Sequence, residues 1–433
     1  MNTAATGHAT DAKRERSPRT DTADGRIGAH HLVSLLARAF GARWRSGAQR
    51  IRNVARRKAF GWIPLTSLLL TTPDAPIRAP DGGTAGSIRT SLGRELQAEV
   101  IVSGLDTPWD LALAPDGALW FTERPGRISR IDPATGEVRR VGEIDVAESG
   151  ESGLMGMAFH PDFPREPVVY FAHSYRSLGG VRNRLIRMRY REGRLANAET
   201  LLDGIPGRGN HNGSRLVVGP DRFLYMTMGD AGEADRAQDR ASLSGKILRL
   251  TLDGRPAPGN PFSNEVWSWG HRNPQGIVFA ADGSQYATEH GPNNADEVNR
   301  IEKGGNYGWP TVHGACDRPD EREFCRTRQV IEPLVEYTPT IAVSGLDVYE
   351  SDRIPGWRGS LVYTSLAGQK LMRLALARDG RSATGQERIL DGEYGRLRDV
   401  VVAPDGTLLV ATSNRDGRGR PAAADDRILR IRP

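Results

Sequence analysis

The chain has 433 residues, which is enough to bury a large core and would usually form two domains or one extended repeat fold. Its formal net charge is +6, but this charge is unevenly distributed. Residues 1–58 carry 13 Lys and Arg against 4 Asp and Glu, whereas the rest of the chain carries 46 against 49. Because the part expected to fold has no basic excess, we do not expect a nucleic-acid partner.

The first 75 residues differ from the rest in composition. Residues 1–30 are polar and charged, which is typical of disorder. In "RIRNVARRKAFGWIPLTSLLLTTPDAP", basic residues precede a short apolar run, the order found in secretory signals. The run is too short for a stable membrane span. We therefore expect a disordered basic leader over residues 1–75, with a signal-like segment at residues 50–75 and a periplasmic or secreted protein. A cytosolic chain with a disordered extension is the alternative.

Past residue 95 the chain repeats one pattern six times. Each copy has an apolar alternating run, a turn of Asp, Pro or Gly, and a second β-rich run, as in "WDLALAPDGALWFTE" and "SRLVVGPDRFLYMTMGD". The turn aspartates are Asp116, Asp162, Asp221, Asp282, Asp352 and Asp405. The pattern predicts an all-β fold over residues 95–433, a six-bladed β-propeller of four-stranded antiparallel blades. A β-sandwich competes, but it gives no reason for one hairpin to recur six times. We expect "LQAEVIVSGL" to complete the last blade.

The third hairpin carries a polar residue at each foot. His211 and Asp230 are equally far from the Pro220–Asp221 turn, and residues equidistant from a hairpin turn lie opposite one another. A carboxylate that accepts from one imidazole nitrogen leaves the other nitrogen free to take a proton. The pair therefore predicts a general base with its orienting partner, although a solvated loop histidine is the alternative.

Other polar residues are expected at the same face, because every blade runs in the same direction. "WGHRNPQG" places Arg272 and Asn273 at a strand entry, and "YGRLRDV" places Arg396 and Arg398 on one side of a strand. Glu151 stands just before the second hairpin. Arginine side chains suit a ligand with several carboxylates. The alternatives are arginines that satisfy blade-end carbonyls or lie on a solvated face.

An acidic turn follows the fourth hairpin. "EHGPNNADEVN" offers Glu289, Asp296 and Glu297 together with Gly291 and Pro292. Turns rich in carboxylates and bare carbonyls suit Ca²⁺, although acidic loops are usually only solvated.

Two cysteines, Cys316 and Cys325, lie nine positions apart in one loop. Two thiols cannot form a zinc site alone. A local disulfide and a free pair both remain open.

The chain has no phosphate-binding loop, dinucleotide fingerprint, nucleophile elbow or zinc spacing. The predicted site has a base and several cations but no side chain that accepts a hydride. A redox function would therefore need a bound cofactor.

Six motifs complete the picture: "GLMGMAFHPDF", "NHNGSRLVVGPD…GD", "WGHRNPQG", "EHGPNNADEVN", "GGNYGWP" and "RLRDVVVAPDG". Together, and in order over residues 95–433, they resemble the soluble aldose sugar dehydrogenases of the glucose/sorbosone dehydrogenase family, which depend on pyrroloquinoline quinone (PQQ). The resemblance implies a quinoprotein oxidoreductase that oxidises the C1 hydroxyl of aldoses to the lactone, with hydride transfer to PQQ and with bound Ca²⁺. It also implies an aldose substrate and an external electron acceptor, and the chain would be a monomer or homodimer.

The resemblance also implies roles for individual residues. His211 matches the general base, Asp230 its partner, and Arg272 the residue over the reactive quinone carbonyl. Cofactor contacts are implied for Glu151, Arg272, Asn273, Arg396 and Arg398. Calcium ligation is implied for the carbonyls of Gly291 and Pro292 and, in a second calcium region, for Asp296, Glu297, Tyr307 and Asp317.

One position departs from the family pattern. Relatives often have a quinone-pairing Lys in the segment "TSLAGQK", where this chain has Ala367, with Lys370 three residues on. The loss of one cation would weaken cofactor affinity without changing the fold. The alternative functions are a calcium-dependent sugar-lactone hydrolase and a non-catalytic sugar- or protein-binding propeller.

Overall fold

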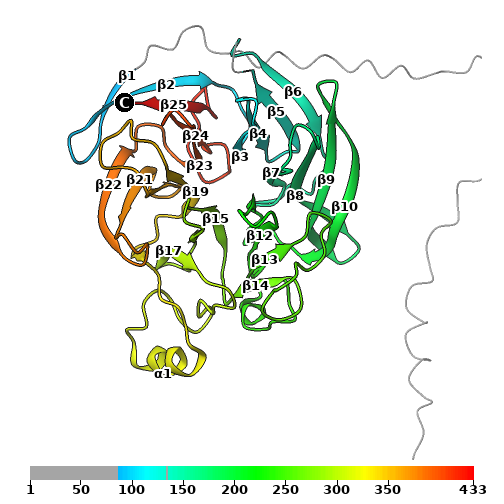
Figure 1. Cartoon of the computed structure of the whole chain (residues 1–433), viewed down its shortest axis with the longest axis vertical. Coiled ribbons are helices and arrows are strands. Elements are labelled where there is room, and N and C mark those ends of the chain that lie inside the picture. The colour runs from blue at the N-terminus through cyan, green and yellow to red at the C-terminus, as the bar shows by residue number, and fades with distance from the viewer. Residues whose placement is uncertain (1–85, 133–134) are drawn as a thin grey trace, which may run out of the picture. The chain divides into compact units, whose positions relative to one another are not determined.

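The computed structural model describes residues 86–132 and 135–433, which form a six-bladed β-propeller (Figure 1). All strand pairs within the blades are antiparallel, and five blades have four strands each, so the predicted fold class is confirmed. The predicted leader over residues 1–75 and its signal-like segment lie outside the described residues. In the part of the chain that is described, no helix combines the length and apolar character needed to cross a bilayer.

Five blades are continuous in sequence, and each begins with its innermost strand. Blade 1 contains β3 (Pro108–Leu113), β4 (Leu119–Glu123), β5 (Arg127–Ile131) and β6 (Val138–Glu143). Blade 2 contains β7 (Leu154–Phe159), β8 (Val168–Ser177), β9 (Gly180–Arg191) and β10 (Arg194–Pro206). Blade 3 contains β11 (Leu216–Val218), β12 (Leu224–Met228), β13 (Lys246–Leu250) and β14 (Val266–Trp269). Blade 4 contains β15 (Pro274–Phe279), β16 (Gln285–Glu289), β17 (Asp296–Ile301) and β18 (Val335–Tyr337). Blade 5 contains β19 (Val343–Tyr349), β20 (Ser360–Ser365), β21 (Lys370–Leu376) and β22 (Ala383–Asp391).

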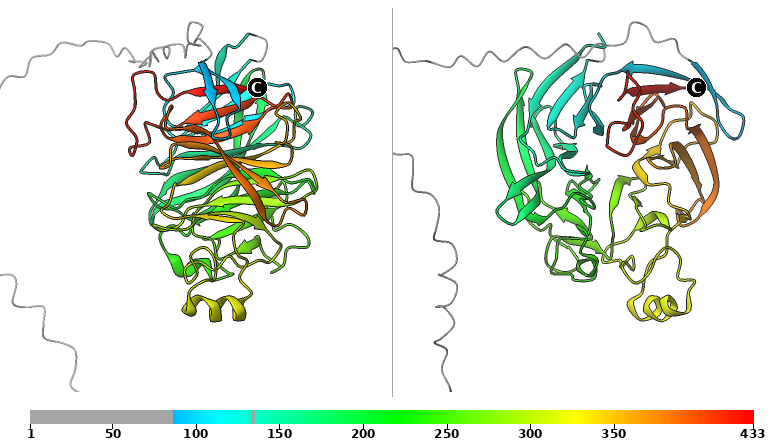
Figure 2. Two further views of the ribbon diagram at one scale, coloured as in Figure 1. Left: turned by 90° about the vertical axis from the view of Figure 1, so that its left-hand side faces the viewer. Right: turned by 180° about the vertical axis from the view of Figure 1, so that it is seen from behind.

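The sixth blade joins the two ends of the described chain. It contains β23 (Leu397–Val402), β24 (Leu408–Thr412) and β25 (Ile428–Arg432), followed by β2 (Glu95–Val102) and β1 (Gly86–Arg89). Figure 2 shows β2, in blue, beside β25, in red, and the two strands pair in register. The prediction that "LQAEVIVSGL" completes the last blade is therefore confirmed. Because this blade combines strands from both ends of the described chain, hydrogen bonds between β2 and β25 close the ring of blades.

The hairpin turns explain the repeated Asp-Gly signature. Gly117, Gly283 and Gly406 have φ values of 82°, 84° and 82°, in the left-handed region that side chains with a Cβ rarely adopt. Each of these turns sends the chain into a second strand that is entirely buried, namely β4, β16 and β24. These strands are buried because each sheet is packed between two neighbours.

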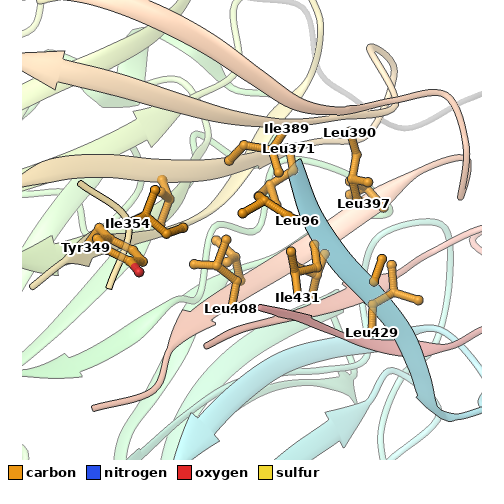
Figure 3. Packing of buried hydrophobic residues seen from close by; sticks show 14 of the residues in the cluster. Leu96, Tyr349, Ile354, Leu371, Ile389, Leu390, Leu397, Leu408, Leu429 and Ile431 are labelled. Atoms are coloured by element: carbon orange, nitrogen blue, oxygen red, sulfur yellow. The ribbon is translucent and has the colours of Figure 1, made fainter. Parts of the chain in front are cut away.

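The hydrophobic core is divided into six clusters, one between each pair of adjacent blades. The cluster in Figure 3 lies between blades 5 and 6, where Leu96 and Leu429 pack with Leu371, Leu390 and Leu397. Leu96 comes from β2, so ring closure also completes an apolar cluster. Each blade therefore depends on both neighbours for its core.

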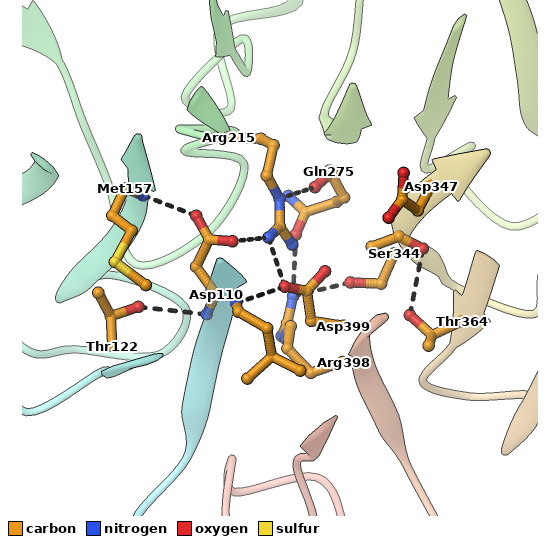
Figure 4. A network of polar contacts seen from close by, with 12 residues as sticks. Asp110, Thr122, Met157, Arg215, Gln275, Ser344, Asp347, Thr364, Arg398 and Asp399 are labelled. Atoms are coloured by element: carbon orange, nitrogen blue, oxygen red, sulfur yellow. Dashed lines mark hydrogen bonds and ion pairs between the residues drawn. The ribbon is translucent and has the colours of Figure 1, made fainter. Parts of the chain in front are cut away.

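A polar network, rather than a hydrophobic core, joins the blades at the centre of the ring (Figure 4). Arg215, just before β11, donates from Nη1 to Asp110 Oδ1 at 2.5 Å and to Asp399 Oδ2 at 2.9 Å. Its Nε donates to the Gln275 carbonyl at 3.0 Å. The exposed fraction of Arg215, Asp110 and Asp399 is 5% or less. One guanidinium thus holds together blades 1, 3, 4 and 6.

Three aspartates of the innermost strands, of which Asp110 and Asp399 are buried, also accept a backbone N–H from the next blade. The pairs are Asp110 with Met157 at 2.6 Å, Asp347 with Val402 at 2.7 Å, and Asp399 with Leu111 at 2.7 Å. These bonds fix the spacing between neighbouring innermost strands, and hence the width of the space at the axis.

The one α-helix among the described residues, α1 (Pro319–Arg328), belongs to an excursion between β17 and β18 at the periphery of the ring (Figure 1). Cys325, in α1, forms a disulfide with Cys316. Of the two alternatives for the cysteines, the structure has the local disulfide.

We expect Arg215→Ala to lower the free energy of unfolding by about 3–5 kcal/mol, the usual cost of leaving a buried charge without its partner. Urea unfolding followed by tryptophan fluorescence measures this change. The matched control is Arg358→Ala, which breaks an exposed ion pair with Asp352 and should change stability little. Equal effects of the two substitutions would contradict the role given to the axial network.

Candidate active site

The innermost strands share an irregularity that brings side chains to one end of the axis. The pairing of the first two strands shifts register near the beginning of blades 1, 2, 4, 5 and 6. In blades 1, 4, 5 and 6 the residues at these shifts are Trp109, Gln275, Ser344 and Arg398, respectively. A bulge re-aims the side chain of the extra residue, and bulges are frequent beside active sites. Arg398 Nη1 donates to Gln275 Oε1 at 2.9 Å, and its guanidinium lies 5.7 Å from the centre of the Trp109 ring.

His211 and Asp230 meet as predicted. His211 Nδ1 lies 2.8 Å from Asp230 Oδ1, while Nε2 has no hydrogen bond within the described residues. The backbone register differs by one residue from the predicted pairing, because the His211 carbonyl accepts from Ala231 at 3.1 Å. His211 has a φ of 54°, a left-handed conformation that is uncommon for residues other than glycine and that occurs often at functional sites.

Asp230 is held by several donors, so its carboxylate has a fixed direction. Oδ1 also accepts from the Gly232 N–H at 2.7 Å, and Oδ2 accepts from Trp309 Nε1 at 2.9 Å. Asp230 is 1% exposed. The carboxylate can therefore hold the His211 ring with Nδ1 toward Asp230 and Nε2 available to a substrate.

A cavity of about 190 Å³ lies at the same end of the axis. Its lining is rich in cations and includes Arg124, Glu151, Gln275, His290, Asp416, Arg398 and Arg418. Glu151 accepts the His211 N–H at 3.2 Å through Oε2 and Arg418 Nη1 at 2.6 Å through Oε1. Burial opposes the charged form of Glu151, but His290, Arg418 and Arg398 outweigh it and lower the pKa of Glu151.

The two arginines of "RLRDV" have different surroundings. Arg398 lines the axial cavity, whereas Arg396 is paired with Asp416 through Nη2 at 2.7 Å and does not line it. Burial lowers the pKa of Arg398 to about 10, against the opposing charges of Asp416 and Glu151, so Arg398 remains protonated near neutral pH. The register shift at Arg398 interrupts the alternation of side chains along the strand. This is the physical reason that Arg396 and Arg398 do not share one side, contrary to the prediction from the sequence.

Arg272 and Asn273 stand beside the His211 loop. Arg272 Nη1 donates to the His290 carbonyl at 3.1 Å, and its guanidinium lies 5.3 Å from the centre of the Trp309 ring. Asn273 Oδ1 accepts from the Gly213 N–H at 3.1 Å. Burial lowers the pKa of Arg272, and nearby carboxylates, Asp230 first among them, oppose this shift.

Several buried donors at this end of the axis have no hydrogen-bond partner within the described residues. They are Arg272 Nε, Asn273 Nδ2, His290 Nε2 and Arg398 Nε. Buried polar groups are nearly always paired, so unpaired donors around a cavity point to a bound acceptor. The donor set and the cationic lining fit a planar ligand with several carboxylates and carbonyls, such as PQQ.

The predicted calcium residues divide into two groups. Gly291, Pro292, Glu297 and Tyr307 line a small recess beside Arg272. The carbonyls of Gly291 and Pro292 accept no hydrogen bond from the described residues. Two bare carbonyls beside a carboxylate fit the oxygen ligands that Ca²⁺ prefers.

The other two predicted calcium residues, Asp296 and Asp317, do not line the recess, and Tyr307, which lines it, is already hydrogen-bonded. Asp296 accepts N–H groups from Gly291 at 2.8 Å and Ile341 at 2.7 Å, and so shapes the turn. The Tyr307 hydroxyl donates to the Arg300 carbonyl at 2.7 Å. Asp317 is exposed and does not line the recess. Across residues 86–132 and 135–433, no three His, Cys, Asp or Glu side chains form a metal-binding group, so backbone oxygens would have to contribute.

Sequence reasoning missed several residues of the cavity. Gln275 and His290 lie in the motifs "WGHRNPQG" and "EHGPNN", in which only neighbouring residues were predicted to belong to the site. Arg124, Asp416 and Arg418 lie outside any motif used, and their proximity depends on loops from blades 1 and 6. Leu366, the neighbour of Ala367, lines the cavity, whereas Lys370 does not and lies 3.5 Å from Asp391.

Comparisons with known proteins identify the family of this chain. The model of the family described as Glucose / Sorbosone dehydrogenase matches residues 105–429. Quinoprotein glucose dehydrogenase B of Acinetobacter calcoaceticus is 30% identical, with 77% of this chain and 88% of that protein covered. An uncharacterized protein of Synechocystis sp. is 34% identical, with coverage of 82% and 96%. The solved PQQ-bound form of aldose sugar dehydrogenase from Streptomyces coelicolor is 37% identical, covers 83% of this chain and 99% of its own, and has a TM-score of 0.69. The chain therefore belongs to the glucose/sorbosone dehydrogenase family.

Proposed function

We propose that the protein is a PQQ-dependent dehydrogenase that oxidises the C1 hydroxyl of an aldose to the lactone. The observation that carries this proposal is the oriented His211–Asp230 pair beside a cavity with unpaired cationic donors. The PQQ-bound relative supports the choice of cofactor. The signal-like sequence segment supports export to the periplasm or beyond, where the Cys316–Cys325 disulfide would persist.

His211 acts as the general base. Its Nε2 takes the proton of the C1 hydroxyl, while Asp230 holds Nδ1 and stabilises the imidazolium that forms. Trp309 and Gly232 keep the Asp230 carboxylate in place, so the ring does not need to reorient during the reaction. PQQ, when bound, supplies the hydride acceptor.

The cationic side chains hold and polarise the cofactor. Arg398 and Asn273 would contact its carboxylates and carbonyls, and Glu151 would lie between cofactor and sugar. Arg272, held over Trp309, would stabilise negative charge on a carbonyl oxygen. Arg396 would act mainly by neutralising Asp416 at the cavity wall.

Calcium would be held at the recess beside Arg272 by the carbonyls of Gly291 and Pro292. There it would act as a Lewis acid toward the cofactor. Asp296, Glu297, Tyr307 and Asp317 are the proposed residues of a second, structural calcium region. In the described structure Asp296 and Tyr307 already contact the backbone around the recess.

The lactone-hydrolase alternative has less support. It would need free carboxylates near the axis to ligate a catalytic metal. The axial carboxylates Asp110 and Asp399 are instead paired with Arg215 and backbone amides.

We expect His211→Ala to lower kcat for aldose oxidation by about 10²–10⁴-fold, the usual contribution of a positioned base. Binding of PQQ should persist, because the cationic lining of the cavity does not include His211. Dye reduction with added Ca²⁺ and PQQ measures turnover, and absorbance titration measures cofactor binding. His160→Ala, at the far turn of blade 2, is the control with an unchanged rate. Oxidation at the parent rate by His211→Ala would show that another group is the base.

Removal of calcium with a chelator should abolish dye reduction, and added Ca²⁺ should restore it. Gly291→Ala should weaken Ca²⁺ binding by about 10–100-fold, the usual effect of disturbing the groups that orient a metal ligand. A Cβ there would lie 1.9 Å from the Asn294 carbonyl oxygen, so the turn must move. At Gly385 a Cβ would meet nothing within 4 Å, which makes Gly385→Ala the matched control. Equal Ca²⁺ affinity of the two variants, measured by calorimetry, would place the ion elsewhere.

A further inference from the structure

A further hollow, a groove of about 350 Å³, is lined by Arg208 and Gly209 of the loop that carries His211. Its walls come from the β8–β9 hairpin, the β10–β11 loop and the segment after β12. Gly207 and Gly209 of the β10–β11 loop line the groove, and the Gly209 carbonyl accepts the Glu151 N–H at 2.7 Å. The charged residues that line it are Arg182, Arg208, Arg236 and Glu233.

Arg208 is the charged group of the groove nearest in sequence to the predicted base, three residues before His211. A Cβ at Gly232 would lie 2.9 Å from Arg208 Nη1, so the guanidinium lies against Gly232, two residues after Asp230. Neither Arg208 nor Arg182 forms an ion pair with any carboxylate in the described ranges. Arg236 has Glu233 at 4.0 Å. The groove therefore carries two arginines that form no ion pair with a described carboxylate, beside one acidic residue, Glu233.

The backbone of Arg208 is fixed relative to His211. Asn212, 2% exposed, accepts the Arg208 N–H at 3.1 Å and donates to the Arg208 carbonyl at 2.7 Å. Asn183 Nδ2 donates to Asn212 Oδ1 at 3.0 Å and ties the loop to β9. A ligand held by Arg208 would thus be held at a defined distance from the predicted base.

We propose that this groove binds the anionic end of the substrate, so that the preferred aldose carries a carboxylate or phosphate away from C1. The inference rests on the proposed function, because the C1 end must reach His211. A guanidinium presents a planar fork of donors that matches carboxylate and phosphate oxygens. Arg208 is a specificity-determining residue in this arrangement.

The test compares kcat/KM for glucuronate and glucose 6-phosphate with kcat/KM for glucose, in the holoenzyme at low and high salt. We expect the anionic sugars to be preferred, and Arg208→Gln to reduce the preference by about two- to fivefold, in keeping with the weak contribution of a charge pair at an exposed arginine. The preference should also fall with added salt, because the groove is open to solvent. Arg255→Gln, at an exposed arginine of blade 3, is the matched control and should keep the preference.

A binding measurement separates this inference from the proposed function. Methyl glucuronide has a blocked C1 and cannot be oxidised there, so its binding can be followed by calorimetry whether or not the protein turns over sugars. Binding that Arg208→Gln weakens and Arg255→Gln does not would support the subsite, even if no aldose were oxidised. Preference for the phosphate alone would assign the groove to sugar phosphates. If glucose is oxidised while neither anionic sugar is preferred and methyl glucuronide does not bind, the subsite is overturned and the dehydrogenase function stands.

Discussion

The buried ion pairs of Arg215 are the constraint on which the rest of the propeller depends. The hydrophobic clusters lie between adjacent blades and do not extend to the centre of the ring. At the centre the innermost strands converge, and polar side chains join them. The charges of Asp110 and Asp399 are removed from water, and only a fixed partner offsets that cost. Arg215 supplies it from a third blade. A movement of blade 1, 3 or 6 relative to the other two would leave a buried charge unpaired.

The candidate active site is built directly on this network. The Gln275 carbonyl accepts from Arg215, while its side-chain amide donates to Asn273 and its Oε1 accepts from Arg398. Asn273 in turn accepts from Gly213, in the loop that carries His211. Hydrogen bonds therefore run from the structural charges at the axis to the groups proposed for cofactor and substrate. Such continuity keeps the base in a strained but defined backbone conformation.

The electrostatics of the two hollows differ in a way that suits two different tasks. The axial cavity has two buried nitrogens without a partner among the described residues, Arg398 Nε and His290 Nε2, which favours one tightly held ligand. The groove at Arg208 is open to water, so its charges act more weakly and in a salt-dependent way. That is appropriate for a substrate that must enter and leave.

The sequence by itself determined the six hairpins, their antiparallel pairing, the closing strand and the His211–Asp230 pair, because these depend on local alternation and turn chemistry. Motifs also located Arg272, Asn273, Gly291 and Pro292. Only the tertiary structure decided that Arg398 faces the cavity while Arg396 is neutralised by Asp416, and that Asp296 binds backbone amides. Only the tertiary structure shows that Arg124 and Arg418 line the axial cavity and that Arg208 lines a groove. Only the tertiary structure shows the ion pairs of Arg215 at the axis. The physical reason is that bulges and contacts between blades set the directions of these side chains. Neither can be deduced from the alternation of side chains along a single strand.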